Sequence, residues 1–317
     1  MKLFVLGKRG SVTHWAEDAV AGFAAAGHDV RFGGFRSPGL YRFLEGALFP
    51  RWADVPLAVR LARAISRFAP DLILVLTAYF IPPPVLGYIA RLPHRPPLFG
   101  WVGDRFSAES AATAALFDAV AYTDTGLLSL HKEIGFASPA IYLPHAANPR
   151  LTAGQSDARQ QQMVFVANPT AYRLAFVRDV RTPLQLYGQG WRQLRGTNHR
   201  IHPRRIGVDE LATVYRTHLA VLNVRNEHNV VAGLNQRHFD PYLAATPVVA
   251  DDQGDLPLCF EPGREMLVYR DVDELNDLYI RLQRQPEFAA AIGNAGRRRV
   301  LAEHTYGHRL AAYAKLA

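Results

Sequence analysis

The sequence alternates short apolar segments with longer amphipathic ones, and this alternation constrains the fold more than any single motif does. Leu72–Leu76 and Leu98–Val102 contain only apolar residues and glycine, as is typical of strands buried on both faces. In the first half of the chain, strands are predicted at Leu3–Leu6, Val30–Phe32, Leu72–Leu76, Leu98–Val102, Ala119–Tyr122 and Ile141–Leu143. Helices are predicted between them at Thr13–Ala26, Leu57–Phe68, Ala111–Phe117 and Gly126–Ile134. This order favours a parallel sheet covered by helices on both faces.

A second series of the same kind follows Thr152–Gln162, a polar segment that we interpret as a linker. Its predicted strands are Met163–Val166, Leu184–Tyr187, Ala220–Val224, Val248–Ala250 and Leu267–Tyr269. One predicted helix ends at Val180, a second covers Leu211–Arg216 and a third begins near Asn235. Asp273–Gln283 and Pro286–Glu303 are predicted to be the closing helices. The sequence therefore predicts an α/β fold with two doubly wound, Rossmann-like domains, 1–151 and 152–317, facing a cleft. An alternative for the last helix is that it packs against the first domain instead of the second.

Charge and cysteine content narrow the classes of ligand and compartment. The 317 residues include 36 Lys and Arg against 28 Asp and Glu, which favours anionic ligands or an acidic membrane surface. The basic residues are scattered rather than gathered in runs, which argues against nucleic acid. Cys259 is the only cysteine, so an internal disulfide is excluded. The start MKLFVLG is too short for a secretory signal, and no apolar run is long enough for a membrane helix. A cytoplasmic protein is predicted, with peripheral association at the inner membrane face left open.

The segment from Gly233 to Asp252 carries the most specific chemical pattern. It predicts a loop, a short helix beginning near Asn235, a turn of small residues and then a strand. A helix start presents unpaired N–H groups that suit a phosphate, and Arg237 adds a cation that can bind phosphate oxygens in bidentate fashion. Asp240 lies one turn further and can accept hydrogen bonds from sugar hydroxyls. The alternative is a surface helix in which Arg237 is incidental and Asp240 caps ahead of Pro241.

Six segments of the second half resemble, in order, the C-terminal domain of CgeB-type (spore-maturation-type) glycosyltransferase-like proteins, which belong with the GT-B glycosyltransferases. They are FVANPTAYRLAFVRDV, LQLYGQGW, DELATVYRTHLAVLNV, GLNQRHFDPYLAATPVVADD, FEPGREMLVYRDVDEL and AGRRRVLAEHTYGHRL. The first half resembles the family at WVGDRF, DAVAYTDTGLLSLHKEIG and IYLPHAANP. The resemblance implies a nucleotide-sugar donor bound by the C-terminal domain and an acceptor bound by the N-terminal domain.

The resemblance also implies which residues bind the donor. Asn235 and Arg237, in a loop with Gly233 and Leu234, would contact the diphosphate. Asp240 stands where relatives commonly have Glu, and by analogy it would hold the ribose with a shorter side chain. The remaining donor-binding candidates are Asn168 after one strand, Tyr187 and Gly188 after the next, and Val208, in the region where such enzymes present backbone groups to the base.

Two residues of the first half are candidates for the catalytic base. His14 follows Gly7–Ser11, a turn that lacks the third glycine of the dinucleotide fingerprint. A neutral imidazole can accept the proton of an acceptor hydroxyl, and Asp104 at the end of a strand can orient it or be the base itself. The alternative is that His14 caps or packs a helix and Asp104 only ends a strand.

These observations together predict a glycosyltransferase, with a hexose as the expected group. It would move the sugar from a nucleoside diphosphate sugar to an acceptor nucleophile in the cleft. No metal is expected, because His199 and His202 have no second ligand pair at metal spacing and a helix dipole with an arginine can neutralise the leaving diphosphate. The acceptor is left open between a glycan, a lipid-linked glycan, a small molecule and a protein. A catalytically silent nucleotide-sugar-binding or scaffold protein is the main alternative, and a two-domain nucleotide-sugar epimerase is another.

Overall fold

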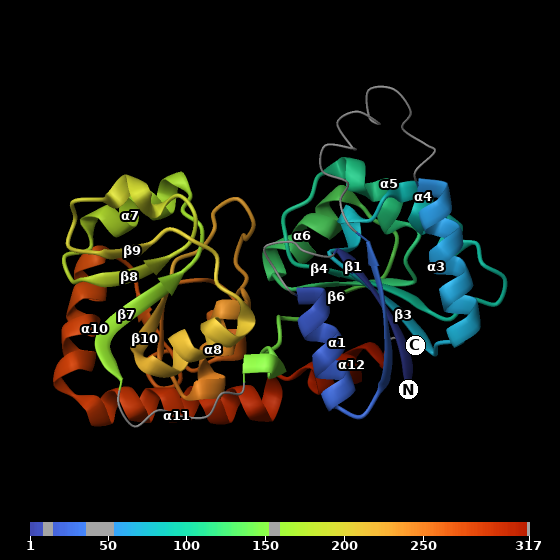
Figure 1. Cartoon of the computed structure of the whole chain (residues 1–317). Helices are drawn as coiled ribbons and strands as arrows, with labels where there is room; N and C mark the ends of the chain where they lie inside the picture. Colours follow the sequence, from blue (N-terminus) through green and yellow to red (C-terminus); the bar gives the residue numbers. More distant parts are fainter. Residues whose placement is uncertain (9–14, 36–53, 152–158, 316–317) are drawn as a thin grey trace. The chain divides into compact units, whose positions relative to one another are not determined.

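The computed structural model describes residues 1–8, 15–35, 54–151 and 159–315, and it divides into two compact units. The first unit is Met1–Leu143 together with the chain from Tyr306 onward, and the second is Pro144–Thr305. Each unit contains a six-stranded parallel sheet with helices on both faces (Figure 1), so the predicted two-domain α/β fold is confirmed.

The sheet of the first unit has the strand order β2-β1-β3-β4-β5-β6. Its strands are β1 (Lys2–Lys8), β2 (Asp29–Phe35), β3 (Leu72–Leu76), β4 (Leu98–Val102), β5 (Ala119–Tyr122) and β6 (Ala140–Tyr142). Its helices are α1 (Trp15–Ala25), α3 (Asp54–Phe68), α4 (Pro83–Ala90), α5 (Ala111–Ala114), α6 (Thr125–Ile134) and α12 (Tyr306–Tyr313), with 3-10 turns η1 (Ala78–Phe80) and η2 (Ala108–Ser110). Helix α12 packs here because Tyr313 stacks on Phe99 and Tyr306 meets Phe23 edge-on.

The sheet of the second unit has the order β12-β11-β10-β7-β8-β9. Its strands are β7 (Gln160–Val166), β8 (Leu184–Tyr187), β9 (Arg200–His202), β10 (His218–Asn223), β11 (Val248–Asp251) and β12 (Leu267–Tyr269). Its helices are α7 (Ala171–Asp179), α8 (Val208–Thr217), α9 (Leu256–Cys259), α10 (Val272–Arg284) and α11 (Pro286–Glu303). Its 3-10 turns are η3 (Pro149–Leu151), η4 (Trp191–Leu194), η5 (Gln236–His238) and η6 (Asp240–Ala244).

Successive residues of the buried strands point to opposite faces of the second sheet. Phe165 packs with Tyr279 of α10, whereas its neighbour Val164 packs with Tyr215 of α8. Figure 1 shows α10 beside one face of this sheet and α8 beside the other. The two faces therefore bury separate apolar clusters.

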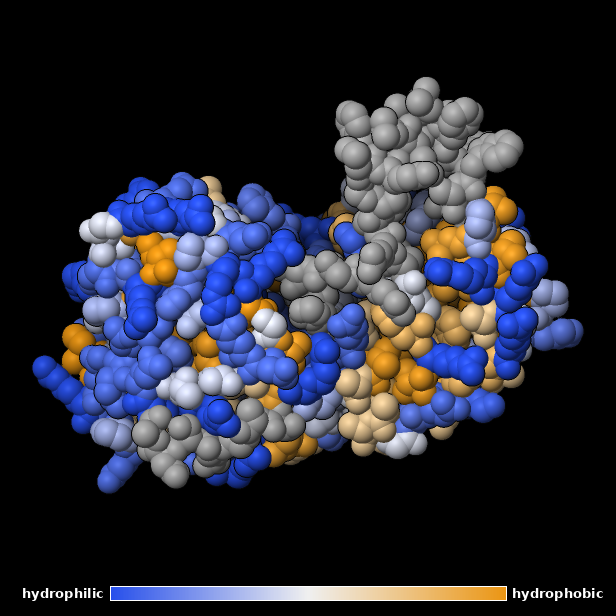
Figure 2. All heavy atoms as spheres, viewed as in Figure 1, coloured by the Kyte–Doolittle hydropathy of each residue, from blue (hydrophilic) through white to orange (hydrophobic). Residues whose placement is uncertain are grey.

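The division between the units lies earlier in the chain than predicted. Residues 144–151 lie in the second unit, where Leu151 packs in the core and the Asn148 N–H donates to Asp240. Residues 160–162 belong to β7 rather than to a linker, and 152–158 are outside the described residues. The second unit presents a mostly hydrophilic face in Figure 2. Among the described helices, none is both long and apolar enough to cross a bilayer.

Gly188 gives a test of this fold, because it takes a left-handed φ of 145° directly after β8. A Cβ at this position would lie 2.1 Å from the Ala167 carbonyl oxygen. We expect Gly188→Ala to lower the free energy of unfolding by about 2 to 4 kcal/mol, from backbone strain together with overpacking. Gly196→Ala is the matched control, since its φ is 89° but nothing lies within 4 Å of the added Cβ. It should cost only about 1 kcal/mol. Equal losses in urea denaturation would show that the contact with Ala167 is unimportant.

Candidate functional site

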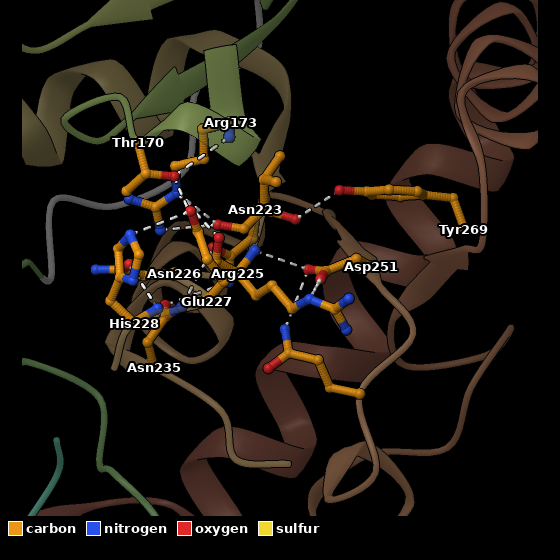
Figure 3. A network of polar contacts seen from close by, with 12 residues as sticks. Thr170, Arg173, Asn223, Arg225, Asn226, Glu227, His228, Asn235, Asp251 and Tyr269 are labelled. Carbon is orange, nitrogen blue, oxygen red and sulfur yellow. Dashed lines mark hydrogen bonds and ion pairs between the residues drawn. The ribbon is translucent and has the colours of Figure 1, made fainter. Parts of the chain in front are cut away.

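The strand order of the second sheet places a topological switch point between β7 and β10. From β7 the chain moves to β8 and β9 on one side, and from β10 it moves to β11 and β12 on the other. In an open parallel sheet, the connections diverge at such a point and leave a crevice outside the carboxyl ends of the two central strands. The loops after β7 and β10 are therefore where a ligand is expected, and Figure 3 shows the polar network that joins them.

Arg173 ties the loop after β7 to the loop after β10. It lies in the first turn of α7, it is 4% exposed, and its guanidinium donates to carbonyl oxygens of Asn168, Val224 and Arg225 at 2.8–3.1 Å. Burial, together with the nearby positive charge of Arg237, lowers the pKa of Arg173 to about 9. Within the described residues Arg173 makes no ion pair, so its charge is balanced only by carbonyl dipoles and more distant carboxylates.

Asn223, the last residue of β10, is the centre of the network. Its Oδ1 accepts from Arg237 Nε at 3.2 Å, and its Nδ2 donates to Asn235 Oδ1 at 3.2 Å. Its backbone carbonyl accepts from the Tyr269 hydroxyl, and the His238 ring lies against its amide, with Nδ1 2.9 Å from Nδ2. Burial lowers the pKa of His238 to about 3, so this imidazole is neutral and adds no charge.

Asp251 ends β11 and faces Arg225. Its Oδ1 accepts from the Arg225 backbone N–H at 3.0 Å and from Gln253 Nε2 at 3.1 Å, while Arg225 Nε lies 3.6 Å from Oδ2. Burial raises the pKa of Asp251 to about 6, although Arg225 opposes the shift. The Asp251 side chain is 8% exposed and that of Arg225 is 43% exposed, so Arg225 also faces solvent.

The predicted helix after Gly233 is wrong in type. The segment forms two separate 3-10 turns, η5 and η6. Pro241 explains the break, because it has no N–H to donate to an earlier carbonyl and it disfavours a helical conformation at the preceding residue. The N–H of Arg237 is also already satisfied by Asn235 Oδ1 at 3.0 Å. A phosphate bound here would therefore not face the dipole of a long helix, and its binding would depend on side chains.

The structure brings the predicted residues of this segment together. Asn235 and Arg237 both contact Asn223, and both are partly exposed. Burial lowers the pKa of Arg237, and it makes no ion pair in the described part of the chain. Gly233 and Leu234 are buried behind them. Their contact with a diphosphate stays a prediction.

Asp240 is 6% exposed, and its Oδ1 accepts from the Asn148 N–H at 2.8 Å. This bond attaches the segment that follows β6 to the turn η6. At least one oxygen of the Asp240 carboxylate therefore stabilises the structure. The contact of Asp240 with a ribose stays a prediction.

The other donor-binding candidates lie along the carboxyl ends of β7, β8 and β9. Asn168 accepts from the Gln189 N–H at 3.1 Å and is partly exposed. Tyr187 is buried and stacks on His202 with ring centroids 4.2 Å apart, beside Gly188. Val208 is the first residue of α8 and is half-buried. Trp191, by contrast, is fully buried core, and its Nε1 donates to Ala167.

The two candidates for a base lie in the first unit. His14 is outside the described residues. Asp104 is partly exposed and follows β4, at the carboxyl end of that strand as expected. Their pairing, and the choice between them as base, stay predictions. The described residues contain no group of three His, Cys, Asp or Glu side chains arranged to hold a metal ion.

Sequence reasoning missed a hydrogen-bonded chain at the carboxyl ends of β3 and β5. Tyr79 and Tyr122 share a 2.5 Å hydrogen bond between their hydroxyls, and Tyr122 also bonds His131 Nδ1 at 2.8 Å. His131 Nε2 donates to the Ser138 carbonyl at 3.0 Å. Because Nε2 carries the proton, the neutral ring accepts at Nδ1, and both tyrosine hydroxyls donate inward. The only signal in the sequence is that Tyr122 ends an otherwise apolar strand.

Comparison with known proteins supports a relation to glycosyltransferases. Residues 171–315 match the family described as glycosyl transferase-like. No curated protein matches the sequence. Similar solved structures include sucrose-phosphate synthase from Thermosynechococcus elongatus, with a TM-score of 0.70, 15% identity and coverage of 100% of this chain and 98% of that one. HepE from Anabaena in complex with UDP has a TM-score of 0.68, 13% identity and 99% coverage of both chains. Its complex with UDP-glucose has a TM-score of 0.69, 11% identity and the same coverage. The fold is therefore the two-domain α/β fold of GT-B glycosyltransferases.

Asp251 gives a prediction about pH. Because its pKa in the folded protein, about 6, lies above the ordinary value of 3.8, the folded state binds this proton more tightly than the unfolded state. Protonated Asp251 therefore adds to the free energy of unfolding at low pH, and this contribution is lost as the pH rises through about 6. Asp251→Asn lacks this titration. Its stability relative to the wild type should therefore rise by about 2 to 3 kcal/mol between about pH 4 and about pH 7.

Urea denaturation at the two pH values measures this difference. Asp252→Asn is the control, because the Asp252 side chain is 58% exposed and no such change is expected for it. A difference between Asp251→Asn and wild type that does not change with pH would contradict the assignment.

Proposed function

We propose that this chain is a glycosyltransferase that takes its sugar from a nucleoside diphosphate sugar, bound by the second unit at the carboxyl ends of β7 and β10. The observation that carries the proposal is the partly exposed Arg237, held by Asn223 beside the buried cation of Arg173 at the switch point. Cations at this place suit a pyrophosphate. The match of residues 171–315 to a glycosyl transferase-like family and the UDP complexes of HepE support the same ligand class.

In this proposal, Arg237 and Asn235 bind the diphosphate. Asp240 contacts the ribose, and the loops that carry Tyr187, Gly188 and Val208 lie along the base. The arginines stabilise the charge that develops on the leaving diphosphate, so no metal ion is required. Positive side chains fixed before the reaction can provide this stabilisation without rearranging.

The acceptor is proposed to be a hydroxyl or a similar nucleophile, and the transferred sugar a hexose. His14 or Asp104 would take the acceptor proton as the sugar is transferred. The surplus of eight positive charges favours an anionic acceptor, or one presented at an anionic membrane surface on the cytoplasmic side.

Titration calorimetry with UDP, GDP and dTDP tests the donor site. We expect one nucleotide to bind best and Arg237→Ala to weaken it about 10- to 100-fold, because a charge-assisted bidentate contact is lost. Arg264→Ala is the matched control, since Arg264 belongs to the same unit but is 74% exposed and paired with Glu261. Equal affinity in wild type and Arg237→Ala would refute the role of Arg237.

The same titration separates ribose from phosphate contacts. Asp240→Asn keeps an oxygen that can accept from Asn148, but it loses the charge. If Asp240 holds the ribose, this variant weakens the nucleotide and leaves inorganic pyrophosphate unaffected. Equal weakening of both ligands would assign Asp240 a structural role only.

Donor hydrolysis distinguishes an enzyme from a silent nucleotide-sugar-binding protein of the same fold. With the sugar nucleotide of the preferred base, we expect slow release of the nucleoside diphosphate. Its rate should fall about 100-fold or more in His14→Ala or Asp104→Asn, whichever residue is the base. Nucleotide affinity should not change in either variant. Binding without turnover in the wild type would favour the silent protein.

A further inference from the structure

Glu227 lies in the loop that follows β10, beside the switch point of the second sheet. It belongs to a turn after β10 in which the Asn229 and Val230 N–H groups donate to the Asn226 carbonyl. Its carboxylate reaches across to the start of α7, where Oε2 accepts from Thr170 Oγ1 at 2.9 Å and Oε1 accepts from the Tyr172 N–H at 3.4 Å. Figure 3 shows Glu227 directed from its turn toward Thr170 and Arg173.

The surroundings of Glu227 are positive. The positive charge of Arg237 lowers the pKa of Arg173, whereas the charge of Glu227 raises it. Burial raises the pKa of Glu227, but its own backbone N–H, the Thr170 hydroxyl and the Tyr172 N–H outweigh burial, and its pKa is lowered overall. Glu227 is therefore ionised at neutral pH, and its charge opposes that of the nearby Arg173.

The attachment of Glu227 is local and can be broken without disturbing the core. Its side chain is 28% exposed, and its ion-pair partner His228 is 72% exposed. The turn that carries it is closed by bonds within 226–230. Arg173, in contrast, is fixed by three backbone carbonyls and cannot move away from an incoming anion.

We propose that Glu227 stands in for a donor phosphate in the free protein, and that a diphosphate binds by displacing its carboxylate from the start of α7. The inference rests on the proposed function, because it takes a pyrophosphate group as the ligand. A phosphate oxygen accepts from the same kinds of donor, a hydroxyl and a backbone N–H at a helix start, and it carries the same sign of charge. Glu227 therefore sets donor affinity through competition with the negative charge of the ligand.

Glu227→Gln is the test variant, because its amide oxygen can still accept from the Tyr172 N–H and its amide nitrogen can donate to the Thr170 hydroxyl, while the negative charge is removed. The probes are the best-bound nucleoside diphosphate, its monophosphate and inorganic pyrophosphate, in titration calorimetry. We expect Glu227→Gln to bind the diphosphate and pyrophosphate about three- to tenfold more tightly, the size of an anion contact at a helix start. The ratio of diphosphate to monophosphate affinity should rise in the variant, because the ligand with more negative charge gains more when the charge of Glu227 is removed.

Glu274→Gln is the matched control. Glu274 lies in the first turn of α10 in the second unit and, like Glu227, accepts from a backbone N–H, in this case that of Arg270. If both variants gain affinity equally, the effect is one of net charge and the inference is overturned. The inference is also overturned if Glu227→Gln binds the diphosphate as the wild type does, or more weakly. In that case, tight nucleotide binding by the wild type would still support the proposed function. Failure of all three proteins to bind any probe would remove the proposed function itself, and the inference with it.

Discussion

The buried guanidinium of Arg173 is the interaction on which the organisation of the site depends. Removing a cation from water is costly, and here the cost is offset by donation to three backbone carbonyls rather than to a carboxylate. These bonds fix the loops after β7 and β10 against each other. Because the carbonyls are dipoles without net charge, the positive potential of Arg173 persists at the switch point, where Arg237 reinforces it. One side chain thus supplies both the rigidity and the charge of the site.

The sequence predicts the fold well because buried parallel strands leave a local signature. Each central strand is a short apolar run, and no tertiary information is needed to recognise it. The edge strand β9 (Arg200–His202) and helix α4 (Pro83–Ala90) were not predicted. β9 contains the residues Arg-Ile-His and is partly exposed, so it lacks the apolar run, and α4 begins with two prolines that resemble loop punctuation. Helix α4 nevertheless buries Val85, Leu86 and Ile89, so its apolar residues alone did not mark it as a helix.

The candidate site was only partly predictable. Asn235, Arg237 and Asp240 are close in sequence, so a local pattern is enough to single them out as candidates. Arg173 and Val224 are 51 residues apart, and Arg173 reaches the Val224 carbonyl only because the strand order places β10 beside β7. No local pattern encodes that order. The error in the helix predicted after Gly233 has a different cause. The spacing of apolar residues indicates one continuous helix, but Pro241 restricts the backbone conformation there.

The network also explains why cations and a carboxylate can share the site without neutralising each other. Arg237 and Asp251 are linked through Asn223, the neutral His238 and Gln253, whose Nε2 lies 3.1 Å from Asp251 Oδ1 and 3.3 Å from His238 Nε2. The neutral amides and the imidazole fix the positions of Arg237 and Asp251 through hydrogen bonds, but they carry no net charge. Arg237 therefore keeps its orientation through Asn223 while its charge remains available to a ligand. A direct ion pair between Arg237 and Asp251 would hold the arginine equally well, but it would cancel the attraction that an anionic donor requires.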